Sequence, residues 1–332
     1  MNYKESTVIL EEIKKAKKIL LNCHRGPDPD AIGSCLAMYK VLKRMVKKVE
    51  IICPSERLYE NVNYLKDFTE IKTNIVFSSF NFSIYDLFIV FDSSSWEMVS
   101  GDKKSVIPKL PIINIDHHET NTFYSGVNLV DKNASSVGEM LLKIFVDWEI
   151  EIDADCAACL MAAIVGDTGA FRYANTTPST FEAIKLLTEK GANKDQAIFH
   201  IFRSNPSELV KFWGVVLSKL QIDKKYKFVW SAISYKDYEK MGKPENAKET
   251  AASYFTQIVH GTDFGFIAVE QEKGILSISF RSRTGFDTSK IALELGGGGH
   301  IWASGAKVEG LPFNEAVKKV LKICRMYAKM NR

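Results

Sequence analysis

Hydrophobic positions in the first 190 residues fall into two alternating patterns. Short continuous apolar runs predict buried strands at 19–22, 49–53, 87–91 and 111–115. Apolar residues that recur at helical spacing predict helices at 32–46, 134–146, 154–165 and 179–190. Continuous apolar strands alternating with helices are typical of a mostly parallel sheet with helices on both faces. We therefore expect an α/β fold for this part of the chain.

The pattern changes after Gly191, a suitable residue to end the preceding helix. Asn205, Pro206 and Glu208 suggest another helix start, with a capping side chain, proline first and an acid third. Further strands are predicted at 228–234, 264–270 and 275–281, and helices at 246–260, 288–295 and 313–329. We thus expect a domain at 1–190, a helical connector at 191–215 and a smaller α/β domain at 216–332.

The composition is that of a globular chain. It has 332 residues, 46% of them hydrophobic, and 44 basic against 40 acidic residues give a net charge of +4. That charge is too small for a protein that coats duplex DNA, yet it permits an anionic substrate. Six cysteines are too few for a disulfide scaffold, and no uncharged run reaches about 18 residues. We expect a cytoplasmic protein without a membrane segment.

Three predicted strands run directly into polar residues of the kinds that bind metals. The first leads to His24, Asp28 and Asp30, the third to Asp92, and the fourth to Asp116-His117-His118. The carboxyl ends of parallel strands share one edge of a sheet, and ligands bind there. Asp167 follows a helix and can reach the same edge. We expect all four segments to meet.

So many carboxylates in one cleft repel one another unless cations neutralise them. Mixed imidazole and carboxylate ligands suit Mn²⁺, Fe²⁺, Co²⁺ or Zn²⁺ better than Ca²⁺. Two ions that share a bridging carboxylate account for all the candidates, and such pairs activate water and clamp a phosphate. The alternative is that each acidic side chain only caps a helix or turn, most simply Asp30.

The ordered set of motifs resembles the DHH phosphoesterases. It consists of His24-x-x-x-Asp28-x-Asp30, Asp92, Asp116-His117-His118 and Asp167-Thr168-Gly169. Arg281-Ser282, followed by Gly297-Gly298-Gly299-His300, resembles the appended DHHA1 domain. Length and spacing are most similar to the bifunctional oligoribonucleases that also dephosphorylate 3′-phosphoadenosine 5′-phosphate (pAp).

The resemblance implies a role for each matching residue. His24, Asp28 and Asp92 would hold one Mn²⁺, and Asp30, Asp92, His117 and Asp167 the other, with Asp92 bridging. His118 would face the substrate phosphate, and Asp116 would orient the histidine loop. Arg281 and Gly297–Gly299 would bind the nucleotide, and His300 would stack on a base or bond a phosphate. Pro29 stands where the family commonly has glycine, and bulky Trp302 lies beside the expected base pocket.

The glycine run 296–299 has neither Walker nor dinucleotide-binding spacing. Consecutive glycines expose backbone N–H groups to an anion, although a flexible turn has the same composition. Arg172 is a further candidate for a phosphate contact. The lysines at 14–18 and 40–48 are expected to be solvated helix faces, and Cys156 and Cys159 to be core residues.

These features predict a two-metal phosphoesterase that hydrolyses short single-stranded RNA and small nucleotides such as pAp. A linear or cyclic dinucleotide phosphodiesterase (pApA or cyclic di-AMP) is an alternative. A pyrophosphatase would need no nucleotide pocket, and a processive RecJ-like nuclease usually has additional domains. A non-catalytic nucleotide- or RNA-binding regulator is the alternative from another class. The sequence leaves monomer and homodimer open.

Overall fold

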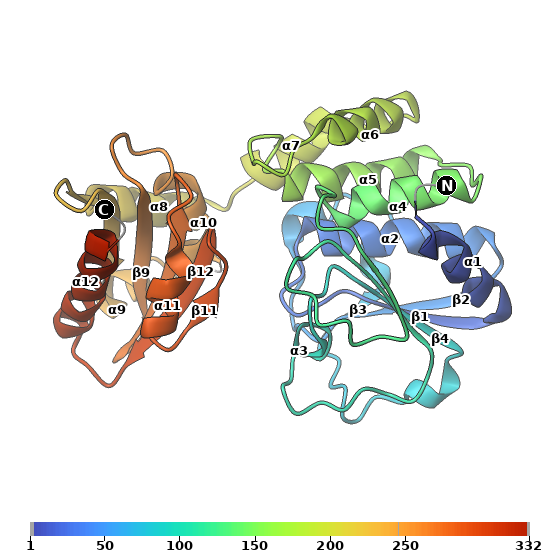
Figure 1. Cartoon of the computed structure of the whole chain (residues 1–332), viewed down its shortest axis with the longest axis horizontal. Coiled ribbons are helices and arrows are strands. Elements are labelled where there is room, and N and C mark those ends of the chain that lie inside the picture. Colours follow the sequence, from blue (N-terminus) through green and yellow to red (C-terminus); the bar gives the residue numbers. More distant parts are fainter. Residues whose placement is uncertain (1–2, 245, 331–332) are drawn as a thin grey trace. The chain divides into compact units, whose positions relative to one another are not determined.

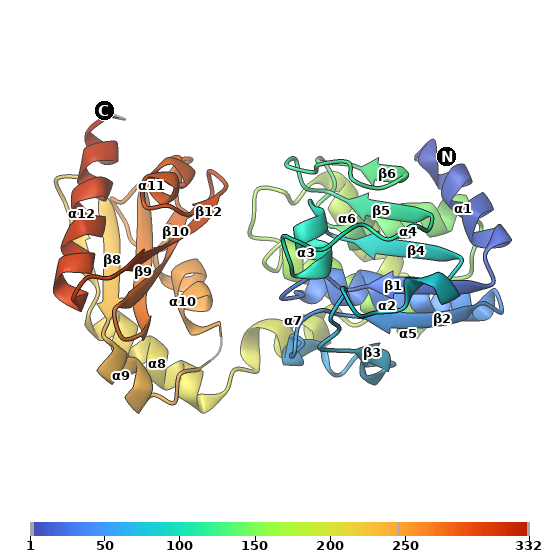
Figure 2. The same cartoon turned by 90° about the horizontal axis from the view of Figure 1, so that it is seen from below.

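The apolar runs of the first half form one six-stranded sheet in the computed structural model, which describes residues 3–244 and 246–330. Its strands are β1 (Lys18–Asn22), β2 (Lys48–Ile52), β3 (Ile71–Lys72), β4 (Leu87–Phe91), β5 (Ile112–Asp116) and β6 (Val127–Val130). Figure 2 shows them side by side in the order β3-β2-β1-β4-β5-β6, and every neighbouring pair is parallel. The predicted parallel sheet is confirmed.

The two faces of this sheet are covered differently. The helices are α1 (Glu5–Lys15), α2 (Pro29–Arg44), α3 (Trp96–Ser100), α4 (Val137–Asp147), α5 (Ala154–Asp167), α6 (Pro178–Glu189) and α7 (Lys194–Arg203). Figure 1 shows α2, α4 and α5 on one face, where they enclose the main core. The other face is covered by α3, which contributes Trp96, and by a loop region whose aromatic side chains include Phe77 and Tyr85. Three short 3₁₀ turns lie at Glu60–Val62, Phe68–Glu70 and Phe82–Ile84.

Helices α2 and α5 pack in close contact because small residues line their interface. A Cβ placed on Gly33 would lie only 2.4 Å from the carbonyl oxygen of Cys159. Cys156 and Cys159 are fully buried in this core, as predicted. The prediction that the lysines are solvated is wrong at Lys40. Its side chain is buried, and its ammonium donates to the backbone oxygen of Lys66 and to the carboxylate of Asp67.

The second half forms a mixed sheet in the order β11-β12-β10-β9-β8-β7. Its strands are β7 (Gln221–Asp223), β8 (Phe228–Ile233), β9 (Phe264–Glu272), β10 (Ile275–Ser282), β11 (Gly298–Gly299) and β12 (Ala303–Glu309). Only β8 and β9 are parallel neighbours. The helices are α8 (Ser207–Ser218), α9 (Tyr235–Lys240), α10 (Ala247–Phe255), α11 (Thr288–Glu294) and α12 (Phe313–Met330).

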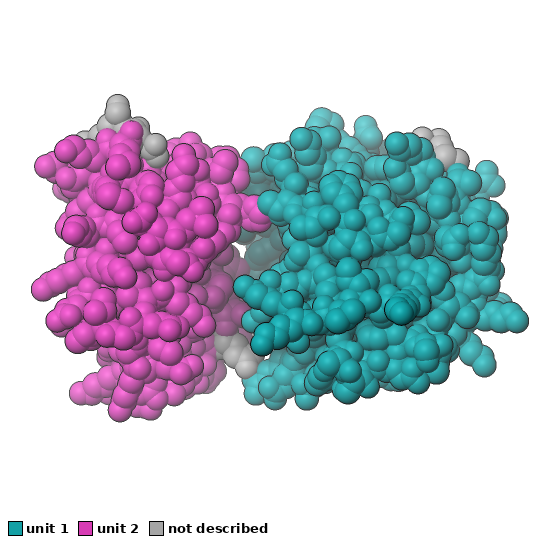
Figure 3. Space-filling model, turned by 60° about the horizontal axis from the view of Figure 1, so that its bottom comes forward, with its two compact units in different colours: residues 1–204 teal, residues 205–332 magenta. Residues whose placement is uncertain are grey.

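Contacts along the chain separate two compact units, Met1–Ser204 and Asn205–Arg332, coloured in Figure 3. Asn205 was expected to cap a helix, but the residue that precedes α8 is Pro206, and no side chain caps this helix. Pro206 has an extended ψ of 142°, which excludes it from the first turn. Over the residues that the structure describes, every helix is too short or too polar to span a bilayer.

Candidate metal centre

The metal-type residues collect where the strand order of the first sheet reverses. The chain runs from β1 outward to β2 and β3, then returns to β4 on the other side of β1. Such a reversal opens a crevice at the carboxyl ends of the strands. His24 follows β1, Asp92 follows β4, and Asp116 is the last residue of β5. The topology therefore brings three of the four predicted segments to one crevice.

The start of α2 fixes two carboxylates. Asp28 precedes the helix and accepts hydrogen bonds from the backbone N–H groups of Asp30 and Ala31, at 2.9 and 3.0 Å. Asp28 is thus the cap of α2, and the alternative that gave this role to Asp30 is wrong. Asp30 instead accepts from the backbone N–H groups of Val137 and Gly138, at 2.7 and 2.9 Å, in the first turn of α4.

Asp92 lies at the centre of the cluster. Its Oδ2 is 3.2 Å from Nε2 of His24, and its Oδ1 is 3.4 Å from Nε2 of His117. The backbone of Asp92 is left-handed, with a φ of +52°, and its N–H donates to the carbonyl of Ile115. Few residues other than glycine, asparagine and aspartate adopt this conformation readily. The turn directs one oxygen of the Asp92 carboxylate toward His24 and the other toward His117.

Both histidines beside Asp92 are oriented by backbone carbonyls. Nδ1 of His24 lies 2.9 Å from the oxygen of Arg25, and Nδ1 of His117 lies 3.2 Å from the oxygen of Ala134. This arrangement accounts for a ring proton on Nδ1, so that with a cation bound Nε2 would serve as the ligand atom. Metal-binding histidines are held in this way in proteins generally.

Asp167 ends α5 and completes the cluster from the fourth segment. Its Oδ2 is 3.5 Å from Nε2 of His117. The side-chain amide of Asn175 donates to the backbone oxygen of Asp167 at 3.1 Å and to that of Ser135 at 2.9 Å. Asn175 therefore supports the position of Asp167. Nothing in the local sequence distinguishes this asparagine from a solvent-exposed one.

The cluster holds more negative charge than its surroundings neutralise. Burial raises the pKa of Asp167 to about 7, and burial with repulsion from Asp92 raises the pKa of Asp28 and Asp30. Burial acts in the same direction at Asp92, but the neighbouring imidazoles of His117 and His24 outweigh it and hold its pKa well below the usual range. Burial lowers the pKa of His24, but Asp92 more than compensates and raises it to about 9. Bound cations would neutralise the negative charge of this carboxylate cluster.

Among the described residues, three overlapping groups of side chains could hold a metal ion, each with ligand atoms within 4.8 Å of one another. The groups are His24, Asp28 and Asp92; Asp30, His117 and Asp167; and Asp92, His117 and His118. Oδ1 of Asp92 is buried, has no hydrogen-bond partner in the described part of the chain, and faces the second group. Since an unsatisfied buried carboxylate oxygen is costly, a cation at this point explains it.

His118 and Asp116 form a pair at the edge of the cluster. Nδ1 of His118 is 2.7 Å from Oδ1 of fully buried Asp116 and 3.4 Å from Oδ1 of Asp92. The side-chain amide of Asn121 donates to the other oxygen of Asp116. Asp116 thus orients His118, whose side chain is 37% exposed and accessible to a ligand. Nothing in the local sequence indicates that Asn121 supports Asp116.

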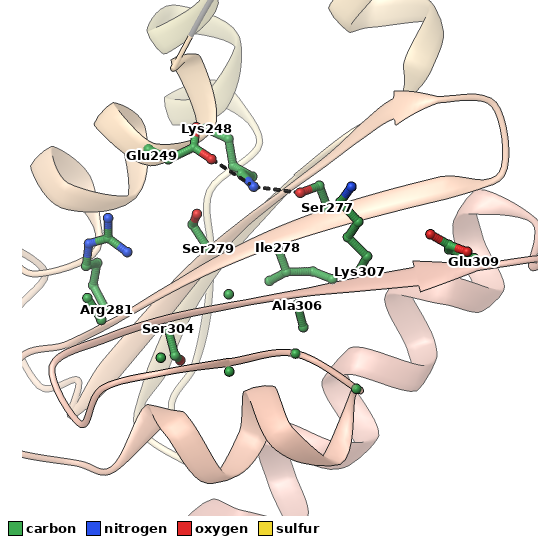
Figure 4. A pocket seen from close by; sticks show the side chains of 16 residues that line it. Lys248, Glu249, Ser277, Ile278, Ser279, Arg281, Ser304, Ala306, Lys307 and Glu309 are labelled. Carbon is green, nitrogen blue, oxygen red and sulfur yellow. Dashed lines mark hydrogen bonds and ion pairs between the residues drawn. The ribbon is translucent and has the colours of Figure 1, made fainter. Parts of the chain in front are cut away.

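Four of the six predicted substrate-binding residues meet in a groove of about 870 Å³ in the second unit (Figure 4), whereas His300 and Arg172 are not among its lining residues. Arg281 and Gly297–Gly299 line it, together with residues that sequence reasoning missed: Lys248, Ser277, Ser279 and Lys307. A Cβ on Gly297 would lie 2.1 Å from the oxygen of Gly305, so a tight approach to β12 requires this glycine. His300 is exposed, and its backbone N–H donates to Ala303.

Arg172 belongs to the first unit and has other partners there. Its Nε donates to the backbone oxygen of Gly169 at 2.5 Å, and its guanidinium lies 5.4 Å from the centre of the Phe202 ring. These contacts hold the turn after Asp167 against α7. The expected phosphate contact of Arg172 stays a prediction.

Known proteins share this architecture. The chain matches the DHH family, N-terminal domain, over residues 18–164 and the DHHA1 domain over residues 231–329. It is 27% identical to the bifunctional oligoribonuclease and PAP phosphatase NrnA of Thermus thermophilus, over 97% of this chain and 94% of that protein. The protein of the same name from Bacillus subtilis is 26% identical, over 91% and 93%. A crystal structure of an exopolyphosphatase-related protein from Bacteroides fragilis has the same fold, with a TM-score of 0.91 and 22% identity over 98% and 97% of the two chains.

Proposed function

Since the chain belongs to the DHH phosphoesterases, we propose that it hydrolyses short oligoribonucleotides and pAp with two divalent cations, most simply Mn²⁺. The observation that carries this proposal is the placement of Asp92 between two groups of ligands. A carboxylate in that position holds two cations at the short spacing that phosphoryl transfer uses. Mixed imidazole and carboxylate donors favour Mn²⁺ over Ca²⁺.

In this proposal His24, Asp28 and Asp92 hold one cation, and Asp30, Asp92, His117 and Asp167 hold the other. When bound, the pair supplies the Lewis acidity that activates water and neutralises charge on the phosphate. The backbone bonds of His24 and His117 keep their Nε2 atoms aligned for binding. His118, held by Asp116, donates from its other ring nitrogen to a non-bridging phosphate oxygen, as an oxyanion-type donor.

The second unit supplies nucleotide recognition in this proposal. Arg281 donates to a phosphate, and Gly297–Gly299 let the ligand approach the backbone closely. Arg172 contributes a weaker contact, since its guanidinium already donates to Gly169, whereas the exposed side chain of His300 stacks on a base or bonds a phosphate. We also propose a cytoplasmic location, which the six unpaired, buried cysteines support.

The direct test is hydrolysis of pAp, a ribonucleotide dimer, linear pApA and cyclic di-AMP by the purified protein with Mn²⁺. We expect turnover of pAp and the dimer, and a loss of at least about a thousandfold in kcat for Asp92→Asn. Asparagine retains the left-handed turn, so this variant should fold. Asp195→Asn, an exposed carboxylate on α7, is the matched control.

Two outcomes would contradict the proposal. Unchanged turnover by Asp92→Asn would remove the bridging role. Nucleotide binding without hydrolysis under any of Mn²⁺, Co²⁺, Zn²⁺ and Mg²⁺ would identify a regulator rather than an enzyme. Preferential hydrolysis of cyclic di-AMP would change the substrate class but not the site.

A further inference from the structure

The two faces of strand β10 are chemically different. Leu276, Ile278 and Phe280 point into the core that α11 and α12 cover. Ser277, Ser279 and Arg281 alternate with them, and all three line the groove on the opposite face (Figure 4). On the neighbouring strand β9, Ile267 and Val269 face a core shared with α10. The sheet thus changes at β10 from a covered apolar face to an open polar one.

Small residues form the floor of this open face. Ser279 pairs with Gly305 across β10 and β12, and Gly305 pairs with Gly298 across β12 and β11. A Cβ on Gly298 would meet no atom within 4 Å, whereas one on Gly299 would lie 2.5 Å from Ser304. The fold therefore requires glycine at 299 but leaves open space above Gly298. A flat floor of this kind admits a ligand directly onto the backbone.

Cationic side chains lie at two separate places along this floor. Arg281 is at one end, where its Nε donates to Ser253 at 3.1 Å. At the other end Lys248 donates to Ser277 at 2.6 Å, and Lys307 stands opposite Ser277 in the strand register. Ser277 and Arg281 are four residues apart on β10, which corresponds to about 13 Å of strand. One phosphate group cannot contact both ends.

Lys248 is an unusual residue to find in a helix that packs on a sheet. It is only 7% exposed, although lysine is rarely buried without a partner. Among the residues that the structure describes, its ionic partner is Glu249, 3.0 Å away, whose side chain is 46% exposed. Lys307 is exposed and has no hydrogen bond or ion pair within the described residues, while Glu309 lines the same end of the groove. A serine and a solvent-exposed acid compensate poorly for the free-energy cost of burying the Lys248 ammonium.

We propose that Lys248 and Lys307 form a second anion subsite, so that the groove takes ligands with two phosphate groups separated by a nucleoside. This inference rests on the proposed function and narrows its substrate class. It favours 5′-phosphorylated oligonucleotides of three or more residues over pAp, because the single non-scissile phosphate of pAp needs only the Arg281 end. The phosphate at the second subsite displaces Glu249 from Lys248.

A purely structural role for Lys248 predicts different effects of substitution from a phosphate-binding role. If the Lys248–Glu249 ion pair served only to stabilise α10, then Lys248→Met and Glu249→Gln would impair the protein in the same direction. If Lys248 binds phosphate, Glu249 competes with the ligand, and the two substitutions have opposite effects on binding. Lys290→Met, an exposed lysine of α11 paired with Asp287, is the matched control for the loss of one charge.

The experiment measures kcat and KM of the full chain with Mn²⁺ for pAp and for the 5′-phosphorylated trinucleotide pApApA. For Lys248→Met we expect KM for the trinucleotide to rise about tenfold, with kcat and both constants for pAp within about twofold. Glu249→Gln should lower KM for the trinucleotide, and Lys290→Met should change nothing. Lys307→Met, at an exposed position, should weaken trinucleotide binding without any effect on folding.

Equal effects of Lys248→Met on both substrates, or the same sign for Lys248→Met and Glu249→Gln, would overturn the inference. So would an unchanged KM in both lysine variants. If the wild-type chain hydrolyses neither substrate, the proposed function fails instead. Fluorescence anisotropy with a labelled phosphorothioate trinucleotide then tests the subsite alone, and equal affinity of wild type, Lys248→Met and Lys307→Met would exclude it.

Discussion

At the scale of the residue, the site depends on side chains held by a second layer of contacts. Asp116 is the clearest case, because its two oxygens are occupied by His118 and Asn121 while the residue itself is fully buried. Asp116 itself belongs to none of the groups of side chains that could hold a metal ion. Its contribution is the orientation of one imidazole, which is separable from metal affinity.

Asp116→Asn should therefore lower kcat by about 10–100-fold while the Mn²⁺ concentration for half-maximal activity changes little. The asparagine retains the size of the side chain but loses the charge that holds the imidazole. Steady-state kinetics over a Mn²⁺ titration measure both quantities, with Asp195→Asn as control. A large shift in Mn²⁺ requirement at unchanged kcat would place Asp116 among the ligands instead.

Residues that act through sequence-local motifs were predictable, and those that act through distant contacts were not. His24 and Asp92 closely follow strands and Asp116 ends one, so strand prediction alone brought them together. Asn175 and Lys248 have no such signal, because their partners Ser135 and Ser277 are 40 and 29 residues away. Lys40 has the sequence context of a surface lysine, and only the fold places Asp67 beside it.

At the scale of the element, the spacing of α2 and α5 sets the geometry of the site. A Cβ on Gly166 of α5 would lie 2.6 Å from Cβ of Pro29, the first residue of α2. Pro29 stands between the ligand candidates Asp28 and Asp30, and Gly166 precedes Asp167. This contact therefore determines how closely the two sets of carboxylates approach.

Gly166→Ala should destabilise the protein by about 1–3 kcal/mol and reduce activity, because the rigid proline ring cannot move aside. Pro29→Gly removes the ring, so in that background Gly166→Ala should become neutral or stabilising by up to about 1 kcal/mol through helix propensity. Chemical denaturation of the four members of this double-mutant cycle measures the coupling. Additive effects would show that the two residues do not touch.

Helix α4 is joined to α6 by Glu139, which is fully buried. Its carboxylate accepts from Ser135, Ser179 and Thr180 and pairs with Lys143 at 2.7 Å. Burial acts against the charge, but the hydrogen bonds from Lys143 and the serines outweigh it and lower the pKa of Glu139 to about 2. The folded state therefore binds this proton less readily than the unfolded state does.

Glu139 should consequently stabilise the fold at pH values above its ordinary pKa of about 4.5, and this contribution should be lost as the pH falls toward 2. Glu139→Gln should cost about 2 kcal/mol at neutral pH, the usual value for a charge-assisted hydrogen bond. Urea unfolding at pH 7, 5 and 3 tests both statements. A wild-type advantage that persisted undiminished at pH 3 would contradict the assignment.

Segments with a strong apolar pattern were predicted well. Strand β12 was not, because its composition suits a ligand-binding groove rather than a buried strand. The strand at 87–91 has the predicted bounds, because five consecutive apolar residues pair on both sides. Strand β12 was missed, since its sequence ASGAKVE lacks β-branched and aromatic residues at most positions. Small residues of this strand line the groove. The same small side chains therefore make the strand hard to predict and leave space for a ligand.

At the scale of the whole molecule, the candidate metal ligands and the groove proposed for nucleotide recognition belong to different compact units. All candidate metal ligands lie between residues 24 and 167, in the first unit. Cation binding should therefore stabilise that unit selectively, by about 2.7 kcal/mol at a concentration one hundred times Kd.

Hydrogen exchange with and without Mn²⁺ tests this expectation. Protection should increase around the ends of β1, β4 and β5 and at the start of α2, and it should stay constant across residues 205–332. Removal of Mn²⁺ with a chelator should reverse the change. A uniform rise in protection over both units would show that cation binding is coupled to the second unit as well.

The candidate metal ligands are widely separated along the chain. This separation determines when the cluster can form during translation. His24 is made early, but its counterpart Asp167 is added only after about half of the polypeptide has been translated. A ribosome-bound fragment that stops short of α5 lacks both Asp167 and the helix against which α2 packs. The nascent protein should thus be unable to cleave phosphate esters until the entire amino-terminal unit has emerged, which protects cellular RNA from a half-made nuclease.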